Sequence, residues 1–413
     1  MFKYKYLHKI FNTEDASTYE KAKNDRLSSF GAIWLDFKMK PYKFSGEFQL
    51  FFYNHPDMMK KAETIMSDSE EIKKIARELP GIAKESYQIN TLVEEMQGTN
   101  EIEGVRSSKA EMNEGLRKII KDGTEPIRHK SLIKSYLNLQ KTKIDLLTAP
   151  KDIREIYDYL VYEEIKERDK PDGLLFRTDP SELAGSTSDK IINVSTLSEQ
   201  SIEAELEKLI TFLNSDMLPQ LHKVAIGHFI FGYIHPFYDG NGRTSRYISS
   251  ISIYLRQILG PISALSLSKA CKDNLRVYLD AFANTNSFKS AGDVTFFIDS
   301  FFDILIDEQK VIIADLKEKK AQLAHIEETL TGNDELDIKE KAMLYLLFQE
   351  YVYGEFSEGL TKKEIIQFSN KKIATDYYFN KVKDSLLAKK AIKIIKQKPM
   401  ELTIEAAYFG IAN

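Results

Sequence analysis

Hydrophobic residues recur with the spacing of an α-helix along most of the chain between residues 57 and 330. Pro80 predicts the start of one helix, which we expect to continue to about residue 104. Ser108 and Glu111 form a capping box that predicts another. Further helical periods cover 129–147, 150–168, 200–214, 216–234, 242–258, 267–286 and 291–330. The chain is therefore expected to be mainly α-helical.

Two segments depart from this pattern. Residues 1–60 are rich in aromatic side chains, and hydrophobic and polar residues alternate over 34–40, which predicts a small N-terminal appendage with strands. The pattern leaves open whether the appendage is an independent domain or a set of arms packed on the next one. Residues 173–195 are dense in Gly, Pro, Ser and Thr, and predict a short β-hairpin flap between helices.

The C-terminal segment, residues 335–413, predicts a separate domain. Residues 331–334 read as a linker, which leaves a helical core over 61–330. Beyond the linker the pattern predicts three helices and then a hairpin, with Thr361 and Thr375 capping the second and third helices. This order is typical of a winged helix-turn-helix.

Composition narrows the functional classes. The 413 residues suggest two to four domains, and the net charge of −4 argues against a surface wholly devoted to nucleic acid. Cys271 is the only cysteine, so no intramolecular disulfide can form, and we expect a cytoplasmic protein. Residues 247–265 are apolar but contain Arg, Gly and Pro, and predict buried helix instead of a membrane span.

Charge is distributed unevenly, however. Residues 361–400 contain eleven lysines against three acidic residues, a local charge of +8. Such a stretch could meet the phosphates of DNA, but it holds no arginine for reading bases. DNA binding, protein contacts and target selection all stay open for this domain.

The clearest chemistry lies in residues 235–246, between two apolar helices. His235 can accept a proton from a hydroxyl near pH 7, and Asp239 is a hard carboxylate suited to Mg²⁺. Gly240 and Gly242 permit tight turns, and the amides at the start of the next helix point at an anion. The side-chain amide of Asn241 is expected to donate to a phosphate oxygen, Arg243 and Arg246 to clamp two phosphates, and Phe237 to anchor the loop.

These twelve residues match the Fic signature, His-Pro-Phe-x-Asp/Glu-Gly-Asn-Gly-Arg-x-x-Arg, at every fixed position. The resemblance implies a protein adenylyltransferase, which moves AMP from ATP to a Ser, Thr or Tyr hydroxyl of a protein. It implies His235 as the general base, Asp239 as the Mg²⁺ ligand, and Asn241, Gly242 and the loop amides as the anion hole. Arg243 and Arg246 would bind the phosphate tail.

A second resemblance lies upstream, in Thr99-Asn-Glu-Ile-Glu103-Gly104. It is similar to the inhibitory motif of the Fic class in which the inhibitory helix precedes the core. The resemblance implies that Glu103 pairs with Arg246 and so displaces the γ-phosphate of ATP. A further role for Glu103, the positioning of a water that removes AMP from a modified target, stays open.

The flap completes the resemblance, which covers about residues 80–290 and extends toward 330. In Fic proteins a hairpin flap holds the target segment, and here Gly173, Phe176, Arg177 and Gly185 match its outline loosely. We therefore expect a target protein to dock at about 173–195. The alternative function is a DNA-binding transcriptional regulator whose core senses a nucleotide without transferring it. The target, the nucleotide base and a homo-oligomeric state are left open by the sequence.

Overall fold

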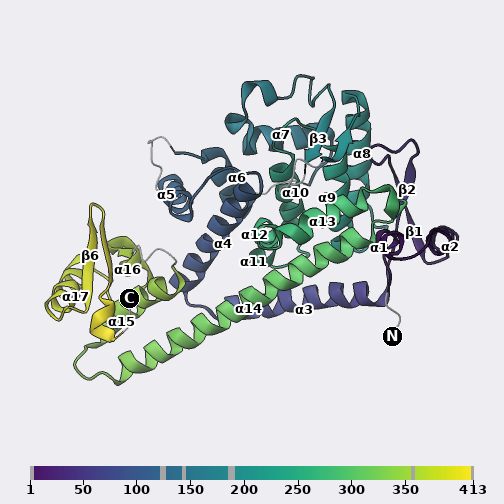
Figure 1. Ribbon diagram of the computed structural model, residues 1–413. Coiled ribbons are helices and arrows are strands. Elements are labelled where there is room, and N and C mark those ends of the chain that lie inside the picture. Colours follow the sequence, from purple (N-terminus) through teal and green to yellow (C-terminus); the bar gives the residue numbers. More distant parts are fainter. Residues whose placement is uncertain (1–3, 121–126, 142–145, 185–190, 355–358, 411–413) are drawn as a thin grey trace. The chain divides into compact units, whose positions relative to one another are not determined.

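The computed structural model describes residues 4–120, 127–141, 146–184, 191–354 and 359–410 (Figure 1). These residues are mainly helical, as predicted, and the strands form three small sheets. No helix among them is long and apolar enough to cross a lipid bilayer. Residues 247–265 fall mainly on two helices, α10 (Asn241–Leu255) and α11 (Pro261–Ala264), with a turn between them. Contacts divide the chain into two compact units, residues 1–70 with 94–310 and residues 71–93 with 311–413.

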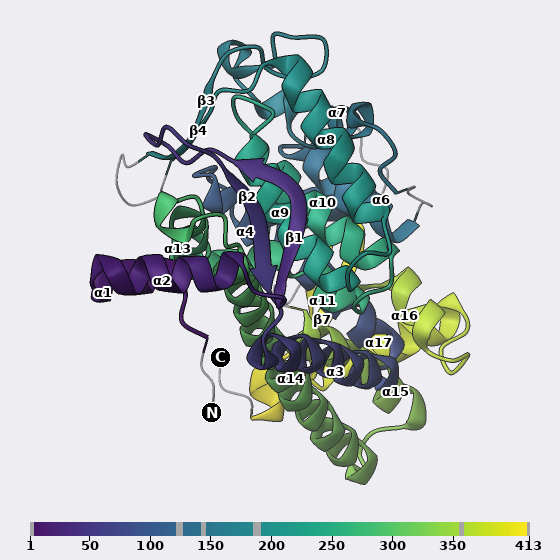
Figure 2. The ribbon, with the colours of Figure 1, turned by 90° about the vertical axis from the view of Figure 1, so that its right-hand side faces the viewer.

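The first unit opens with two helices followed by a two-stranded antiparallel sheet, which Figure 2 shows as a long hairpin. The strands predicted at the N-terminus are present, but helices occupy the residues before them, where Asp15 caps the second helix through the amides of Ser17 and Thr18. The hairpin contacts the rest of the unit, since the backbone of Phe51 pairs with Gly292 and Val294. The elements are α1 (Leu7–Thr13), α2 (Ala16–Leu27), β1 (Ala32–Met39) and β2 (Phe48–Tyr53).

Helix α9 (Gln220–Ile234) is the centre of the first unit. It is apolar on every side, a pattern typical of a helix that is fully buried, and it packs between α8 and α10. The other helices of this part are α5 (Lys109–Ile120), α6 (Lys130–Lys141), α7 (Pro150–Leu160), α8 (Glu199–Asn214), α10 (Asn241–Leu255), α11 (Pro261–Ala264), α12 (Leu267–Asp273) and α13 (Leu275–Thr285).

The predicted flap is an antiparallel hairpin of β3 (Ser181–Ala184) and β4 (Ile191–Ser195), in which Ser181 lies opposite Ser195. Two helices differ from their predictions. The helix expected over 150–168 ends at Leu160, and two 3₁₀ turns follow it. The helix expected over 267–286 is divided at Asn274, which ends α12 and begins α13.

The second unit contains the C-terminal segment. Three helices and a three-stranded sheet follow one another, and the strand order is β5-β7-β6. Capping boxes at Asp337 and Thr361 begin two of the helices, and Thr375 caps the third. The elements are α15 (Ile338–Tyr353), β5 (Leu360–Thr361), α16 (Lys362–Phe368), α17 (Asp376–Ala388), β6 (Ile392–Gln397) and β7 (Met400–Ile404).

Three helices contribute residues to both units: α3 (Pro56–Glu78), α4 (Gly81–Ile102) and α14 (Thr295–Gly332). Helix α4 spans the predicted inhibitory segment almost as expected. The segment predicted as a linker, 331–334, begins inside the last turn of α14, and α15 starts at Ile338.

Candidate active site

The candidate site is the loop that joins the end of α9 to the start of α10. His235 ends α9 in a left-handed conformation, with φ 51°, and Gly240 precedes α10 with φ 84°. A side chain at Gly240 would be strained by that φ and would press against Tyr157 and Val161. The left-handed conformations at His235 and Gly240 let one short loop join the end of α9 to the start of α10. The first backbone amides of α10, which have no acceptor within the helix, therefore lie close to His235.

Phe237 and Asn241 stabilise this loop from within. The Phe237 ring is fully buried and stacks on Tyr157 with 3.8 Å between ring centroids, so it is the anchor that the sequence predicted. The Asn241 side chain accepts a hydrogen bond from the Phe237 amide (2.9 Å) and donates one to the Phe237 carbonyl (2.7 Å). The loop thus uses the Asn241 oxygen and one of the two hydrogens of its amide nitrogen, and binding of a phosphate oxygen by this amide stays a prediction.

His235 is 8% exposed. Burial, together with the positive charge of Arg177, lowers the pKa of His235 to about 3, so the ring is neutral at pH 7. Its Nδ1 lies 3.1 Å from the hydroxyl oxygen of Ser181, on the flap. A neutral imidazole next to a hydroxyl has the protonation state that a general base requires.

Arg177 is fully buried and holds the end of α9 to the flap. Its guanidinium donates to the carbonyls of Ile234 (3.3 Å) and His235 (2.7 Å) and to the hydroxyl of Ser195 (2.6 Å). Ser195 in turn donates to the Ile234 carbonyl (2.7 Å). These bonds satisfy carbonyls that a helix end would otherwise leave open, and they attach β4 of the flap to the end of α9.

Asp239 has the exposure expected of a ligand that meets a soluble substrate. Its side chain is 48% exposed, accepts a hydrogen bond from the Gly240 amide (2.6 Å) and lies 3.9 Å from Arg243. No cluster of three or more potential metal ligands exists among the described residues. One carboxylate nevertheless suits Mg²⁺, which commonly binds one or two protein carboxylates and takes its other ligands from water and substrate phosphates.

Arg243 is buried and pairs with Glu164 at 2.9 Å, while Glu164 also contacts His129 at 2.6 Å. Burial alone would raise the pKa of Glu164, but the hydrogen bond and charge of His129 and the charge of Arg243 lower it. The carboxylate is thus ionised and orients Arg243. Nothing in the sequence near the signature indicated Glu164.

Arg246 carries the predicted inhibitory contact. Its Nη2 lies 2.9 Å from Glu103 and also donates to the hydroxyl (3.0 Å) and carbonyl (3.1 Å) of Thr99. Burial would lower the pKa of Arg246, but Glu103 raises it above its usual range. Arg243 and Arg246, predicted to act as a pair on two phosphates, therefore have separate carboxylate partners in this structure.

Two glycines permit the approach of Glu103. Gly104 follows α4 with φ 71°, which ends the helix next to the glutamate. A Cβ on Gly242 would overlap the carboxylate of Glu103 and lie 2.9 Å from Arg246. Glu103 thus lies directly at the first turn of α10, where amides favour a negative charge.

The flap residues agree with the sequence in part. Gly173 and Phe176 lie before β3, where the carboxylate of Glu199 accepts hydrogen bonds from the amides of Leu175 (2.6 Å) and Phe176 (2.9 Å). Gly185 lies outside the described residues. Ser181 was not predicted, since a serine in a turn-rich segment has no distinguishing signal.

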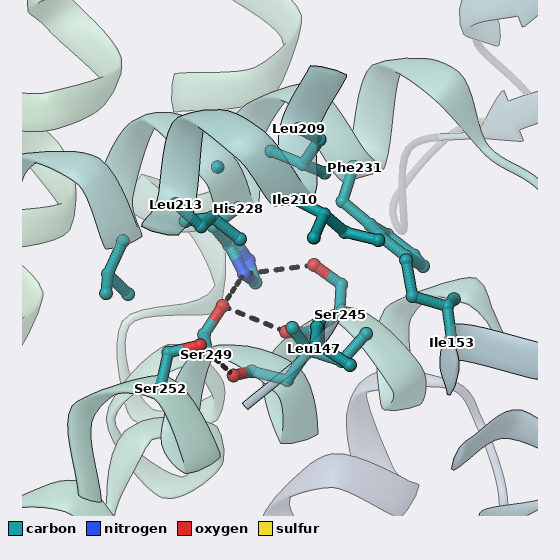
Figure 3. Close-up of a pocket in the computed structure, with 13 residues that line it drawn as sticks. Leu147, Ile153, Leu209, Ile210, Leu213, His228, Phe231, Ser245, Ser249 and Ser252 are labelled. Atoms are coloured by element: carbon teal, nitrogen blue, oxygen red, sulfur yellow. Dashed lines mark hydrogen bonds between the residues drawn. The ribbon is translucent and has the colours of Figure 1, made fainter. Parts of the chain in front are cut away.

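A small cavity beside α9 is a separate feature. His228 points to the hydroxyls of Ser245 and Ser249 there, at 3.0 and 2.9 Å, as Figure 3 shows, and its Nε2 lies 2.7 Å from Tyr278. The cavity measures about 10 Å³, the space of a single water. His228 is therefore a buried histidine held by hydrogen bonds in the core.

Comparison with known proteins bears on the same loop. Residues 146–251 match the Fic/DOC family. Similar solved structures include a Fic family protein from Desulfovibrio desulfuricans G20, with 14% identity, 87% of this chain and 98% of that chain covered, and a TM-score of 0.49. Fic-1 from C. elegans is 16% identical, with 64% of this chain and 75% of that chain covered and a TM-score of 0.43. A Fic domain containing signaling protein from Bacteroides thetaiotaomicron is 16% identical, with 62% of this chain and 97% of that chain covered and a TM-score of 0.41. Since the matched residues include the whole loop from His235 to Arg246, the chain carries a Fic/DOC family domain over residues 146–251.

Proposed function

We propose that this protein is an autoinhibited protein adenylyltransferase, which transfers AMP from ATP to a Ser, Thr or Tyr hydroxyl of a protein. The observation that carries the proposal is the ion pair between Glu103 and Arg246, at 2.9 Å, beside the first turn of α10. A complete Fic signature supplies the transfer chemistry, and a carboxylate from α4 occupies the arginine that would bind the phosphate tail.

The chemistry requires few groups. His235, neutral at pH 7, takes the proton of the acceptor hydroxyl as its oxygen attacks the α-phosphorus of ATP. The open amides at the start of α10 and the guanidinium of Arg243 stabilise the negative charge of the phosphates. Asp239 would hold Mg²⁺ against the phosphates, and the ion would neutralise part of their charge. Pyrophosphate leaves, and no covalent enzyme intermediate is required.

Inhibition follows from competition for one guanidinium. In the observed arrangement the guanidinium of Arg246 donates hydrogen bonds to Glu103 and Thr99, so it is not free to bind a γ-phosphate. A carboxylate and a phosphate oxygen bind a guanidinium in the same way. ATP would then bind with its tail displaced and its α-phosphate badly oriented for attack. A water positioned by Glu103 would extend the same site to removal of AMP.

The test compares wild type, Glu103→Gly and Glu103→Gly/His235→Ala, each incubated with ATP and Mg²⁺ and examined by intact mass. Loss of a charge-assisted bond worth about 1.5–3 kcal/mol predicts at least about tenfold more AMP on Glu103→Gly than on wild type. Loss of the base then predicts a decrease of about 10²–10⁴-fold in the double variant.

Glu101→Gly is the matched control. Glu101 lies in the last turn of the same helix, but it contacts Gln97 and Lys272 instead of Arg246. Its substitution introduces the same helix-weakening glycine and leaves the inhibitory pair in place, so AMP transfer should stay near the wild-type level. Equal transfer by all four proteins would contradict the mechanism.

A second candidate function is DNA binding by the C-terminal domain, as in a nucleotide-sensing transcriptional regulator. The order α15, β5, α16, α17, β6, β7 with the sheet order β5-β7-β6 supports this proposal, since it is the order expected of a winged helix-turn-helix. Six lysines there are exposed and have no ion-pair partner among the described residues: Lys363, Lys371, Lys372, Lys381, Lys390 and Lys398. Both functions can coexist, since catalysis and DNA contact would use different residues.

A further inference from the structure

Ser181 is the hydroxyl that lies at the candidate base. Its oxygen is 3.1 Å from Nδ1 of His235, and both residues are buried, at 6% and 8% exposure. No other side-chain hydrogen bond of Ser181 or His235 is present among the described residues. In any transfer to a hydroxyl, the acceptor must lie within hydrogen-bonding distance of the base. Ser181 occupies that place.

The contact belongs to a well-supported part of the flap. Ser181 lies in β3, opposite Ser195 of β4. Ser195 and Arg177 both bond to the carbonyl of Ile234, and Arg177 also bonds to the carbonyl of His235. Strand β4, which pairs with the strand that carries Ser181, is therefore held to the end of α9 by bonds from side chains to carbonyls, independently of the Ser181 hydroxyl.

We propose that Ser181 is an AMP acceptor of this protein itself, modified by His235 of the same chain. The inference rests on the proposed adenylyl transfer and names one acceptor for it. A serine and a neutral imidazole within about 3.2 Å, with a third group holding the base, form the arrangement by which proteins activate a hydroxyl. The third group here is Arg177, which holds the backbone of His235 through its carbonyl (2.7 Å) and does not bond to the ring.

The step balances without any further reagent. Nδ1 of His235 takes the Ser181 proton, a bond forms between the serine oxygen and the α-phosphorus, and the bond from that phosphorus to the bridging oxygen of pyrophosphate breaks. Pyrophosphate leaves, and the imidazolium later releases its proton to solvent. The product is a phosphodiester between Ser181 and AMP, located beside the base.

The modified serine can no longer donate to His235, and its AMP group occupies the place where another acceptor would bind. Self-modification would thus stop further transfer by the same molecule. An external target hydroxyl must displace Ser181 from the imidazole before it can react, so the serine and the target compete for one base.

The experiment uses full-length Glu103→Gly, incubated with ATP and Mg²⁺, digested and mapped by tandem mass spectrometry. AMP is expected on Ser181. It is expected to fall by about 10²–10⁴-fold in Glu103→Gly/His235→Ala, because the base is lost. Thr178 is the matched hydroxyl: it lies three residues earlier but bonds to Asp172, so it should carry no AMP. Glu103→Gly/Thr178→Ala should still be modified at Ser181.

A mixing experiment tests whether the reaction occurs within one chain. Isotope-labelled His235→Ala protein incubated with unlabelled Glu103→Gly should stay unmodified at Ser181. AMP on other residues of Glu103→Gly but not on Ser181 would overturn the inference and leave the adenylyltransferase proposal standing. AMP on no residue would overturn both. AMP on Ser181 of the labelled chain would overturn the assignment to the same chain.

Discussion

Two histidines with the same low pKa have different surroundings. Burial lowers the pKa of both His228 and His235 to about 3, helped by the charges of Arg246 and Arg177 respectively. His228 is hydrogen-bonded to three hydroxyl groups in the interior, whereas His235 contacts one hydroxyl at the loop. A depressed pKa alone therefore does not single out a candidate base, and the proposal that His235 is the base rests on its position in the loop.

The low pKa of His228 predicts a measurable dependence of stability on pH. The unfolded chain binds a proton at this residue below about pH 6.5, while the folded chain does not do so until about pH 3. Stability is therefore lost as the pH falls from 7 to 5, by about 2 kcal/mol for this residue. Replacement by glutamine removes that loss.

We expect urea unfolding at pH 7 and pH 5 to show a smaller decrease in the free energy of unfolding for His228→Gln than for wild type. Comparing the two pH values within each protein cancels the cost of the substitution itself. His325→Gln is the control, since His325 is exposed on α14, and its decrease should equal that of wild type. The same decrease in wild type and His228→Gln would show that His228 is protonated in the folded state.

Residues that belong to a recognisable motif could be predicted, and residues outside any motif could not. His235, Phe237 and the pair of Glu103 with Arg246 have the surroundings expected of them. Glu164 contacts the loop from 79 residues away, and such a contact leaves no mark in a single sequence. Arg177 was assigned to the flap, but its bonds to the end of α9 could not be predicted.

At the scale of elements, the C-terminal half of α4 is attached to the core by a buried carboxylate and a close backbone contact. Glu95 is fully buried and accepts hydrogen bonds from the amides of Ser268 (2.6 Å) and Lys269 (3.2 Å), at the start of α12. One turn later, a Cβ on Gly98 would lie 3.0 Å from the backbone of Lys269. The position of Glu103 at the end of this helix depends on that packing.

Substitution of Gly98 by alanine should therefore weaken inhibition without touching the ion pair. An extra methyl group in a packed contact costs about 1–3 kcal/mol, and we expect the cost to fall on the inhibited arrangement. AMP transfer, measured by intact mass, should rise above wild type and stay below that of Glu103→Gly.

Gln97→Ala is the neighbouring control, since Gln97 contacts the exposed side chain of Glu101. Transfer by Gly98→Ala at the wild-type level, with an unchanged melting temperature, would show that α4 tolerates the methyl group. The packing at Gly98 would then have no part in inhibition.

Elements were easier to predict than their ends. Helical periodicity located α4, α9 and α10 because each buries an extended apolar face. The same periodicity continued past Leu160 and across Asn274, where the backbone turns although the hydrophobic spacing persists. Tertiary contacts decide such breaks, and a single sequence does not contain them.

At the scale of the whole molecule, charge separates the C-terminal domain from the rest. The chain has a net charge of −4, but residues 361–400 alone carry +8. Five of those eleven lysines form ion pairs, which leaves six exposed and free among the described residues. Lys381 on α17 and Lys398 at the hairpin turn lie on the two elements that a winged helix presents to DNA.

Duplex DNA binding, if this domain performs it, should depend strongly on salt and on these lysines. We expect Lys381→Glu/Lys398→Glu to bind a fluorescent duplex more weakly than wild type. The slope of log affinity against log salt should become shallower by about 1 for each phosphate that the variant no longer neutralises. Fluorescence anisotropy from about 50 to 200 mM salt measures both quantities.

Lys21→Glu/Lys151→Glu changes the net charge equally at exposed positions outside the C-terminal domain, and should bind like wild type. Equal weakening by both double variants would indicate non-specific attraction. No binding at about 50 mM salt, the low end of that range, would remove the DNA-binding candidate and leave a role in protein recognition.

The absence of a side chain at Gly242 restricts which substitutions could relieve the proposed inhibition. The missing side chain at Gly242 admits Glu103 to the start of α10. In the proposed mechanism the same space receives the phosphates of ATP, so any larger residue there would block ATP and Glu103 together. A selection for constitutively active mutants should therefore recover changes in α4 and its contacts and seldom changes in the first turn of α10. Activating mutations would remove the contact of Glu103 with Arg246, whereas the residues at the proposed nucleotide site would tolerate almost no substitution.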